Sequence, residues 1–192
     1  MNWEWLDQRP IIVAIAGPNG SGKTTFYRAH IEASGMKFIN ADLLAAELHI
    51  DAYAAAALSS ELRKELVRQK ESFAFETVLS DPVGEKIDFL RSAVNAGYNV
   101  ALCFVGLSSW EISEQRVAMR VTQGGHDVPT NKLEERYPRS LNNLRKALEQ
   151  LPRVLVFDNS YLSNPYAPIA FSQNGTLIFK AEPLPKWFRE IF

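Results

Sequence analysis

One segment near the start of the chain, residues 11–24, constrains the fold more than any other. It opens with the apolar run Ile-Ile-Val-Ala-Ile-Ala and continues as Gly17-Pro18-Asn19-Gly20-Ser21-Gly22-Lys23-Thr24. A short, β-branched apolar run that ends at a glycine is typical of a strand buried on both faces of a parallel sheet. The residues after it match the G-x-x-x-x-G-K-[ST] pattern in full, in the strand-to-helix context that this pattern requires. The segment therefore predicts a phosphate-binding loop between a buried strand and a helix.

The expected chemistry of this loop follows from its residue types. Glycines let successive backbone N–H groups turn inward around phosphates, and the dipole of the following helix points its positive end at the same anion. Lys23 is expected to reach the β- and γ-phosphates of ATP, and the Thr24 hydroxyl to hold Mg²⁺. The alternative is a glycine-rich turn without a ligand.

Strand and helix signals alternate along the rest of the chain. Further strands are expected at residues 36–40, 72–76, 99–105 and 154–157, with an edge strand at 176–179. Helices are expected at residues 23–33, 43–49, 58–70, 82–95 and from 108 or 109 to 120, in a segment with Leu141, Leu144, Leu148 and Leu151, and around Trp187. Such alternation implies a parallel sheet that is covered on both faces. We predict an α/β fold, the three-layer sandwich of P-loop NTPases, with a mostly parallel sheet of about five to six strands and a helical lid.

Length and composition bound the possible partners. A chain of 192 residues predicts a single domain over residues 1–192. The net charge of -1 gives no overall attraction to nucleic acid or to an anionic membrane, so we expect neither as a partner. The N-terminus carries acids and no apolar stretch, and the single cysteine, Cys103, lies in an apolar run and suits a reducing compartment. We therefore expect a cytoplasmic protein.

A phosphate loop alone does not separate a kinase from a GTPase or a mechanical ATPase. The sequence has no Asn-Lys-x-Asp motif for guanine and no Leu-Ser-Gly-Gly-Gln signature of transporter ATPases. The strand expected at residues 99–105 also lacks a terminal acid. These absences favour a small-molecule kinase, because such an enzyme can place its carboxylates at the ends of other strands.

Two carboxylates follow expected strands and are candidates for the site. Asp42 comes after the strand at 36–40, where it is expected to accept the proton of an acceptor hydroxyl; its alternative role is to cap the next helix. Glu76 ends an aromatic strand, where burial requires a partner. It is expected to contact substrate or a magnesium-bound water, or else to pair with a nearby arginine.

Arginines gather in the segment at residues 109–140, which we interpret as the lid. Arg116 and Arg120 share one helix face, and Arg136 and Arg139 follow a glycine-containing loop. A segment of this kind closes over ATP and neutralises charge on the transferred phosphoryl group; the alternative is a solvated basic face. His126 in the loop is a candidate nucleotide contact, and residues 158–160 either line an adenine pocket or form a plain turn.

Four motifs, in order, resemble the zeta-toxin family, in particular its compact bacterial branch that is often labelled as an ABC-type ATPase. They are Ala16 to Thr25, Phe38-Ile39-Asn40-Ala41-Asp42, Phe73-Ala74-Phe75-Glu76-Thr77, and Gly124-Gly125-His126-Asp127-Val128-Pro129 with Arg136-Tyr137 and Arg139-Ser140. The likeness runs from about residue 12 to residue 159. The loop motif is shared with many enzymes, but the ordered set is specific to this family.

The resemblance implies a kinase that phosphorylates a hydroxyl of a small molecule, as characterised zeta toxins do with the nucleotide sugar UDP-N-acetylglucosamine. It implies catalytic roles for Lys23, Asp42, Arg136 and Arg139, and substrate contacts for Asp42, Glu76 and Thr77. It implies ATP binding by Gly17, Pro18, Asn19, Gly20, Ser21, Gly22, Lys23, Thr24, Thr25, Arg116 and Arg120, with Thr24 on the metal. An antitoxin protein is an expected partner.

Other interpretations stay open at the level of sequence. The acceptor is alternatively a nucleoside, an antibiotic or a nucleic-acid end, and a nucleotide-binding switch without turnover is a further class. The chain is short for a zeta toxin, and Pro138, which separates Arg136 from Arg139, is expected to start or kink a helix.

Overall fold

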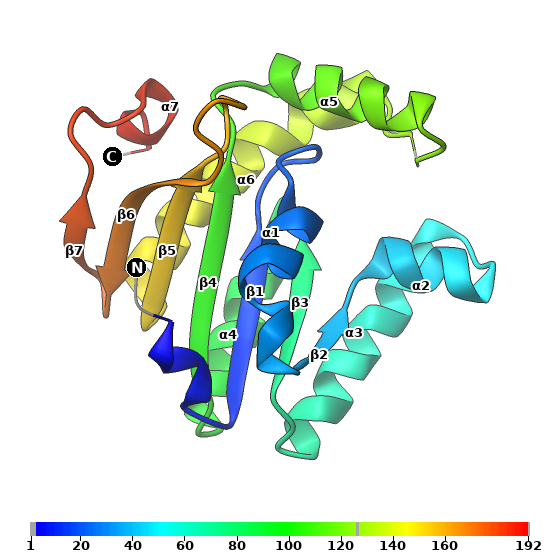
Figure 1. Cartoon of the computed structure of the whole chain (residues 1–192). Helices are drawn as coiled ribbons and strands as arrows, with labels where there is room; N and C mark the ends of the chain where they lie inside the picture. Colours follow the sequence, from blue (N-terminus) through cyan, green and yellow to red (C-terminus); the bar gives the residue numbers. More distant parts are fainter. Residues whose placement is uncertain (1–2, 126, 192) are drawn as a thin grey trace.

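The fold is a seven-stranded sheet between two layers of helices, seen in a computed structural model that describes residues 3–125 and 127–191 (Figure 1). The strand order is β2-β3-β1-β4-β5-β6-β7. The strands are β1 (Ile11–Ala16), β2 (Lys37–Ile39), β3 (Phe73–Thr77), β4 (Asn99–Gly106), β5 (Arg153–Asp158), β6 (Ala167–Gln173) and β7 (Thr176–Lys180). The first five strands in this order are parallel, and β6 and β7 extend the sheet antiparallel. The predicted mostly parallel α/β fold is confirmed, with one strand more than the upper expectation because β6 was not predicted.

The apolar faces of the strands determine where the helices pack. The helices are α1 (Lys23–His30), α2 (Ala41–Leu48), α3 (Ala52–Arg68), α4 (Glu85–Asn95), α5 (Trp110–Thr122), α6 (Thr130–Gln150) and α7 (Lys186–Arg189), with 3-10 turns η1 (Glu4–Asp7) and η2 (Glu32–Ser34). Successive residues of β1 are all fully buried but point to opposite faces, so Ile12 joins the core under α4, α6 and α7, and Ile11 joins the core under α1. The sheet is thus covered on both sides, as Figure 1 shows.

Several helices begin earlier than the sequence predicts. α3 starts at Ala52 because the Asp51 side chain caps it, accepting hydrogen bonds from the backbone N–H groups of Tyr53 and Ala54. α6 starts at Thr130 and continues through Pro138, so the proline lies inside the helix and does not start it. The N-terminal half of α6 therefore belongs to the same helix as the predicted leucine positions.

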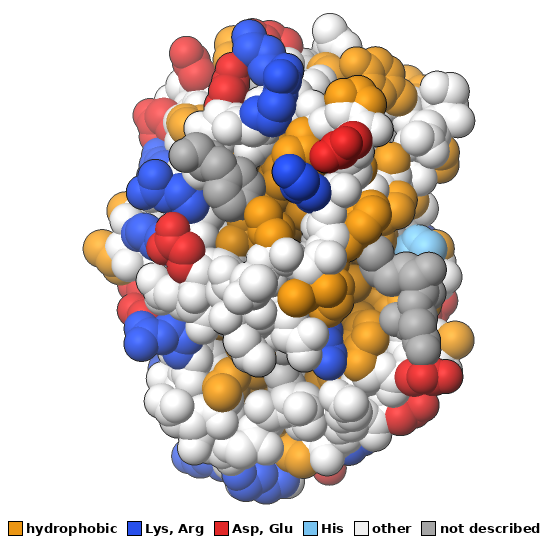
Figure 2. Space-filling view, turned by 90° about the vertical axis from the view of Figure 1, so that its left-hand side faces the viewer, with side chains coloured by type: hydrophobic (Ala, Val, Ile, Leu, Met, Phe, Trp, Pro, Cys, Tyr) orange, Lys and Arg blue, Asp and Glu red, His pale blue; other side chains and the backbone are white. Residues whose placement is uncertain are grey.

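The two edges of the sheet differ in their surroundings. At one edge α2 and α3 stand beside β2 (Figure 1). At the other edge lies β7, whose side chains are all exposed, including Leu177, Ile178 and Phe179. Figure 2 shows this side of the molecule, where apolar side chains gather between charged ones. α5 crosses above the carboxyl ends of the parallel strands, which is the edge where ligands bind in open α/β sheets.

Candidate active site

The loop between β1 and α1 has a backbone that glycine alone suits. Gly22 has a φ of 90°, and a Cβ there would lie 2.8 Å from the Tyr166 hydroxyl oxygen and 2.9 Å from Asn159 Nδ2. Gly17 has a φ of 143°, and its Cβ would lie 2.1 Å from the carbonyl oxygen of Val105. The loop is therefore pressed against β4 and against the segment after β5, which holds its N–H groups in place for an anion.

The segment after β5 braces this loop. Asn159 Nδ2 donates a 2.8 Å hydrogen bond to the carbonyl oxygen of Ser21, and the Tyr166 hydroxyl donates a 3.1 Å bond to that of Gly22. Asp158 accepts a hydrogen bond from the indole nitrogen of Trp187. Residues 158–160 thus do more than form a turn, and the bracing role of Asn159 was not predicted from the sequence. His126, the candidate nucleotide contact, lies outside the described residues.

Lys23 is the buried cation of the loop. Its side chain is 6% exposed, and Nζ donates a 2.9 Å hydrogen bond to the carbonyl oxygen of Pro18 and lies 3.7 Å from Glu76 Oε1. Burial lowers the pKa of Lys23, while the negative charges of Glu76 and Asp42 oppose this shift. An ammonium held in this way is placed to neutralise phosphate oxygens in the loop.

Glu76 joins the loop to the neighbouring strand. β3 pairs with β1 in parallel, with Glu76 opposite Ile15, so its carboxylate emerges beside the loop. Oε2 accepts hydrogen bonds from the Thr24 hydroxyl at 2.7 Å and from Asn40 Nδ2 at 2.9 Å. Among the described residues the cation that pairs with Glu76 is Lys23, so the alternative of an arginine partner is wrong. A threonine hydroxyl and a carboxylate are hard oxygen ligands, and their contact here fits a Mg²⁺ site.

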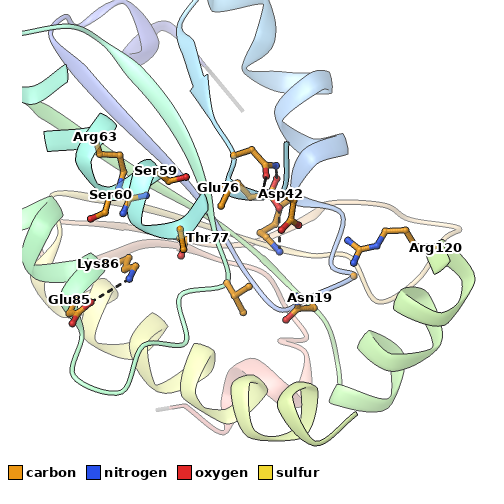
Figure 3. Close-up of a pocket in the computed structure, with 16 residues that line it drawn as sticks. Asn19, Asp42, Ser59, Ser60, Arg63, Glu76, Thr77, Glu85, Lys86 and Arg120 are labelled. Atoms are coloured by element: carbon orange, nitrogen blue, oxygen red, sulfur yellow. Dashed lines mark hydrogen bonds and ion pairs between the residues drawn. The ribbon is translucent and has the colours of Figure 1, made fainter. Parts of the chain in front are cut away.

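Asp42 lies in the first turn of α2 with an exposed carboxylate. It does not cap the helix: Asn40 is the cap, and its Oδ1 accepts hydrogen bonds from the N–H groups of Asp42 at 2.8 Å and of Leu43 at 3.3 Å. Asp42 is therefore available to the cavity that it lines together with Lys23 and Glu76 (Figure 3).

The four arginines of the predicted lid separate into two pairs. Arg116 and Arg120 on α5 line a cavity of 220 Å³ at the loop, together with Lys23 and Thr24. Ser113, which is 1% exposed, fixes α5 there by donating a 2.6 Å hydrogen bond to the carbonyl oxygen of Asn19. The arginines of α6 lie elsewhere: neither Arg136 nor Arg139 lines the cavities that contain Lys23, and Arg139 pairs with Glu135 at 2.6 Å.

A larger cavity of 380 Å³ extends from the loop to α3 and α4. Asp42, Glu76 and Thr77, for which substrate contacts were expected, line this cavity. Arg120, which was expected to bind ATP, also lines it. The residues of this cavity that the sequence analysis missed are Asn40, Ala41, Ala56, Ser59, Ser60, Arg63, Val78, Glu85 and Lys86. Four of them, at positions 56, 59, 60 and 63, have the spacing of one helix face, but spacing alone does not show that this face lines a cavity.

The described residues contain neither a cluster of metal-ligating side chains nor a membrane-spanning helix. Within residues 3–125 and 127–191, no group of three or more histidine, cysteine, aspartate or glutamate side chains is placed to hold a metal ion. In the same part of the chain, none of the helices combines the length and apolarity that a membrane span needs. Cys103 is buried, and burial raises the pKa of its thiol.

The sheet order, the loop and the strand-end carboxylates together define a P-loop kinase-like fold. The AAA domain family AAA_33 matches residues 12–137, and the chain belongs to this family. No curated protein matches the sequence.

Solved structures share the fold at low sequence identity. A chain of the AvrRxo1-ORF1:-ORF2 complex with ATP matches with a TM-score of 0.74 and 16% identity, over 98% of this chain and 66% of that one. A chain of the PezAT chromosomal toxin-antitoxin system of Streptococcus pneumoniae matches with a TM-score of 0.64 and 15% identity, over 96% and 79%. A chain of the Pnkp1/Rnl/Hen1 RNA repair complex matches with a TM-score of 0.60 and 15% identity, over 72% and 46%. The resemblance to zeta-toxin-like P-loop kinases is confirmed for the fold.

Proposed function

We propose that the chain is an ATP-dependent phosphotransferase of the zeta-toxin type, which moves the γ-phosphate of ATP to a hydroxyl of a small molecule. The observation that carries this proposal is that Lys23 and Asp42 line the same cavity. One is the cation that holds the phosphates, and the other is a carboxylate that can accept a proton. A nucleotide sugar such as UDP-N-acetylglucosamine is the first acceptor to test.

Each residue has a distinct role in this proposal. The loop amides and Lys23 bind the phosphates, and Thr24 with Glu76 would hold Mg²⁺, which when bound neutralises phosphate charge. Asp42 accepts the proton of the acceptor hydroxyl as the phosphoryl group arrives. Arg116 and Arg120 lie at the phosphate end of the site, where they balance the charge of the transferred group.

Arg136 and Arg139 have a conditional place in the proposal. They reach the phosphates only if the segment at residues 109–140 closes over the nucleotide, since the structure places them outside the cavities at the loop. A phosphate would then compete with Glu135 for Arg139, and their contact is a weak surface pair with both side chains more than a third exposed.

The decisive experiment follows phosphoryl transfer directly. Purified protein with MgATP and a panel of nucleotide sugars is analysed by ³¹P NMR and mass spectrometry, beside Lys23→Ala, Asp42→Asn and the control Glu47→Gln. Glu47 is an exposed carboxylate on the same helix as Asp42. We expect a phosphorylated acceptor that is lost in Lys23→Ala, falls about 10²–10⁴-fold in Asp42→Asn and is unchanged in the control.

Two outcomes would contradict the proposal. ATP bound without transfer to any acceptor would favour a nucleotide-binding switch, and an Asp42→Asn variant with full activity would remove the proton-accepting role.

A toxic role and a protein antitoxin are part of the same proposal, supported by the PezAT match. Growth arrest on induction of the wild type, absent with Lys23→Ala, is the expected cellular result.

A further inference from the structure

Arg63 is a buried cation whose charge has no anionic partner among the described residues. Its side chain on α3 is 9% exposed, and the guanidinium lies 5.0 Å from the ring centre of Phe75 and 5.7 Å from that of Phe89. Across the described ranges 3–125 and 127–191, no hydrogen bond or ion pair of this guanidinium is found. The rings attract the cation but offer no acceptor to its five N–H groups. Burial lowers the pKa of Arg63, because it removes water from around the charged guanidinium.

A second polar group beside Arg63 is also unsatisfied. Ser59 is 2% exposed, and its hydroxyl makes no hydrogen bond with any described residue. Ser59, Ser60 and Arg63 follow helical spacing on α3, and all three line the 380 Å³ cavity. Buried polar groups are nearly always hydrogen-bonded, so an orphaned hydroxyl and an orphaned guanidinium on one face point to a missing ligand.

The position of this face relative to the phosphate loop is informative. Figure 3 shows Arg63, Ser59 and Ser60 on α3 at one end of the cavity, and Asp42 and Arg120 at the other. Lys86 also lines the α3 end, where it pairs with Glu85 at 3.5 Å. The carboxylate of Glu85 is 69% exposed and paired with Lys86, so its negative charge lies towards solvent.

We propose that Ser59, Ser60 and Arg63 form an oxyanion-binding subsite for the acceptor, so that the substrate carries a phosphate or carboxylate group in addition to the hydroxyl that is phosphorylated. This inference rests on the proposed function. The guanidinium fork matches the two oxygens of such a group, and the serine hydroxyls donate further hydrogen bonds. An acceptor anchored at α3 extends along the cavity and presents its hydroxyl to Asp42.

The subsite can be tested by binding, independently of phosphoryl transfer. Thermal denaturation of the full chain is followed with inorganic phosphate or, separately, acetate as the probe, with excess Mg²⁺ and a non-hydrolysable ATP analogue present to fill the phosphate loop. The variant is Arg63→Met, which keeps an unbranched apolar stem beside the two rings. The control is Arg68→Met, which removes an exposed arginine of the same helix.

We expect at least one anion to raise the melting temperature of the wild type and of Arg68→Met, with half-saturation shifted at least about tenfold in Arg63→Met. A response to phosphate alone or to acetate alone identifies the kind of oxyanion. An equal response in Arg63→Met, or none in any of the three proteins, overturns the proposal.

The melting temperature without anion separates ligand binding from a packing role. A buried charge without a partner destabilises the empty protein, so Arg63→Met is expected to melt at the same temperature as the wild type or higher. A lower melting temperature together with an unchanged phosphate response would assign Arg63 to packing alone.

Turnover gives a separate readout once an active acceptor is known. Acceptors compared in pairs, such as glucose with glucose 6-phosphate, are expected to show a lower KM for the anionic member in the wild type and no such preference in Arg63→Met. If no acceptor reacts but Arg63-dependent phosphate binding persists, the proposed function fails while the subsite stands.

Discussion

At the residue scale, the stability of the site depends on the carboxylate of Glu76. It lies 3.7 Å from the buried Lys23 ammonium and accepts hydrogen bonds from Thr24 and Asn40. Glu76→Gln keeps the size of the side chain but removes the charge that offsets the burial of Lys23. We expect the free energy of unfolding of the nucleotide-free protein to fall by about 1–3 kcal/mol, as measured by urea denaturation.

The control for this prediction is Glu71→Gln. Glu71 pairs with Lys37 at 3.4 Å, but both side chains are about half exposed, so the change in unfolding free energy should stay within about 1 kcal/mol. Equal changes in the unfolding free energy of the two variants would mean that Glu76 does not stabilise the buried charge of Lys23.

The variant Glu76→Gln is also expected to need more Mg²⁺ for half-maximal ATP binding, if Glu76 helps to hold the ion.

At the scale of secondary-structure elements, Pro138 is the residue whose chemistry suits its helix least. It lies inside α6, where it supplies no backbone N–H to the carbonyl of Glu134. Pro138→Ala restores this donor at an exposed position. We expect the free energy of unfolding to rise by about 1–3 kcal/mol, measured by denaturant titration.

The matched variant is Pro129→Ala. Pro129 occupies the N-cap position of α6, where no helical hydrogen bond is lost, so we expect little change or a slight loss of stability. A loss of stability in Pro138→Ala would show that the contacts of the proline ring in the small cavity that it lines with Leu141 and Ile191 outweigh the restored bond.

Parts of the site that are local in the chain could be predicted from the sequence, and parts that depend on strand pairing could not. The phosphate loop was readable because strand, glycines, Lys23 and Thr24 are consecutive, and their spacing alone specifies the structure. The contact of Glu76 with Thr24 depends on β3 lying next to β1, which is a long-range property of the sheet. Arg63 was missed because its role arises only when α3 packs beside β3 and faces the cavity. The register of pairing therefore determined more of the site than local spacing did.

At the scale of the whole molecule, we predict that α5 and the start of α6 close over bound nucleotide. α5 crosses the carboxyl edge of the sheet, and its arginines already line the cavity at the loop (Figure 1). Arg136 and Arg139 are too far along α6 to line it in this structure. Binding of a highly charged nucleotide supplies a reason for closure, because it offers these cations a counter-charge and excludes water.

Limited trypsin digestion tests this closure in the full chain. Cleavage after Arg120 and Lys132, which flank residues 123–130, is expected to slow several-fold with MgATP. A closed segment less often adopts the extended conformation in which trypsin cleaves a chain. Cleavage after Lys186, whose side chain is 82% exposed on the far side of the sheet from α2, is the internal reference and should keep its rate. The protection should be absent in Lys23→Ala. Equal cleavage after Arg120 and Lys132 with and without MgATP, in a protein shown to bind it, would mean that the segment is a fixed wall of the site and that Arg136 and Arg139 take no part in the chemistry.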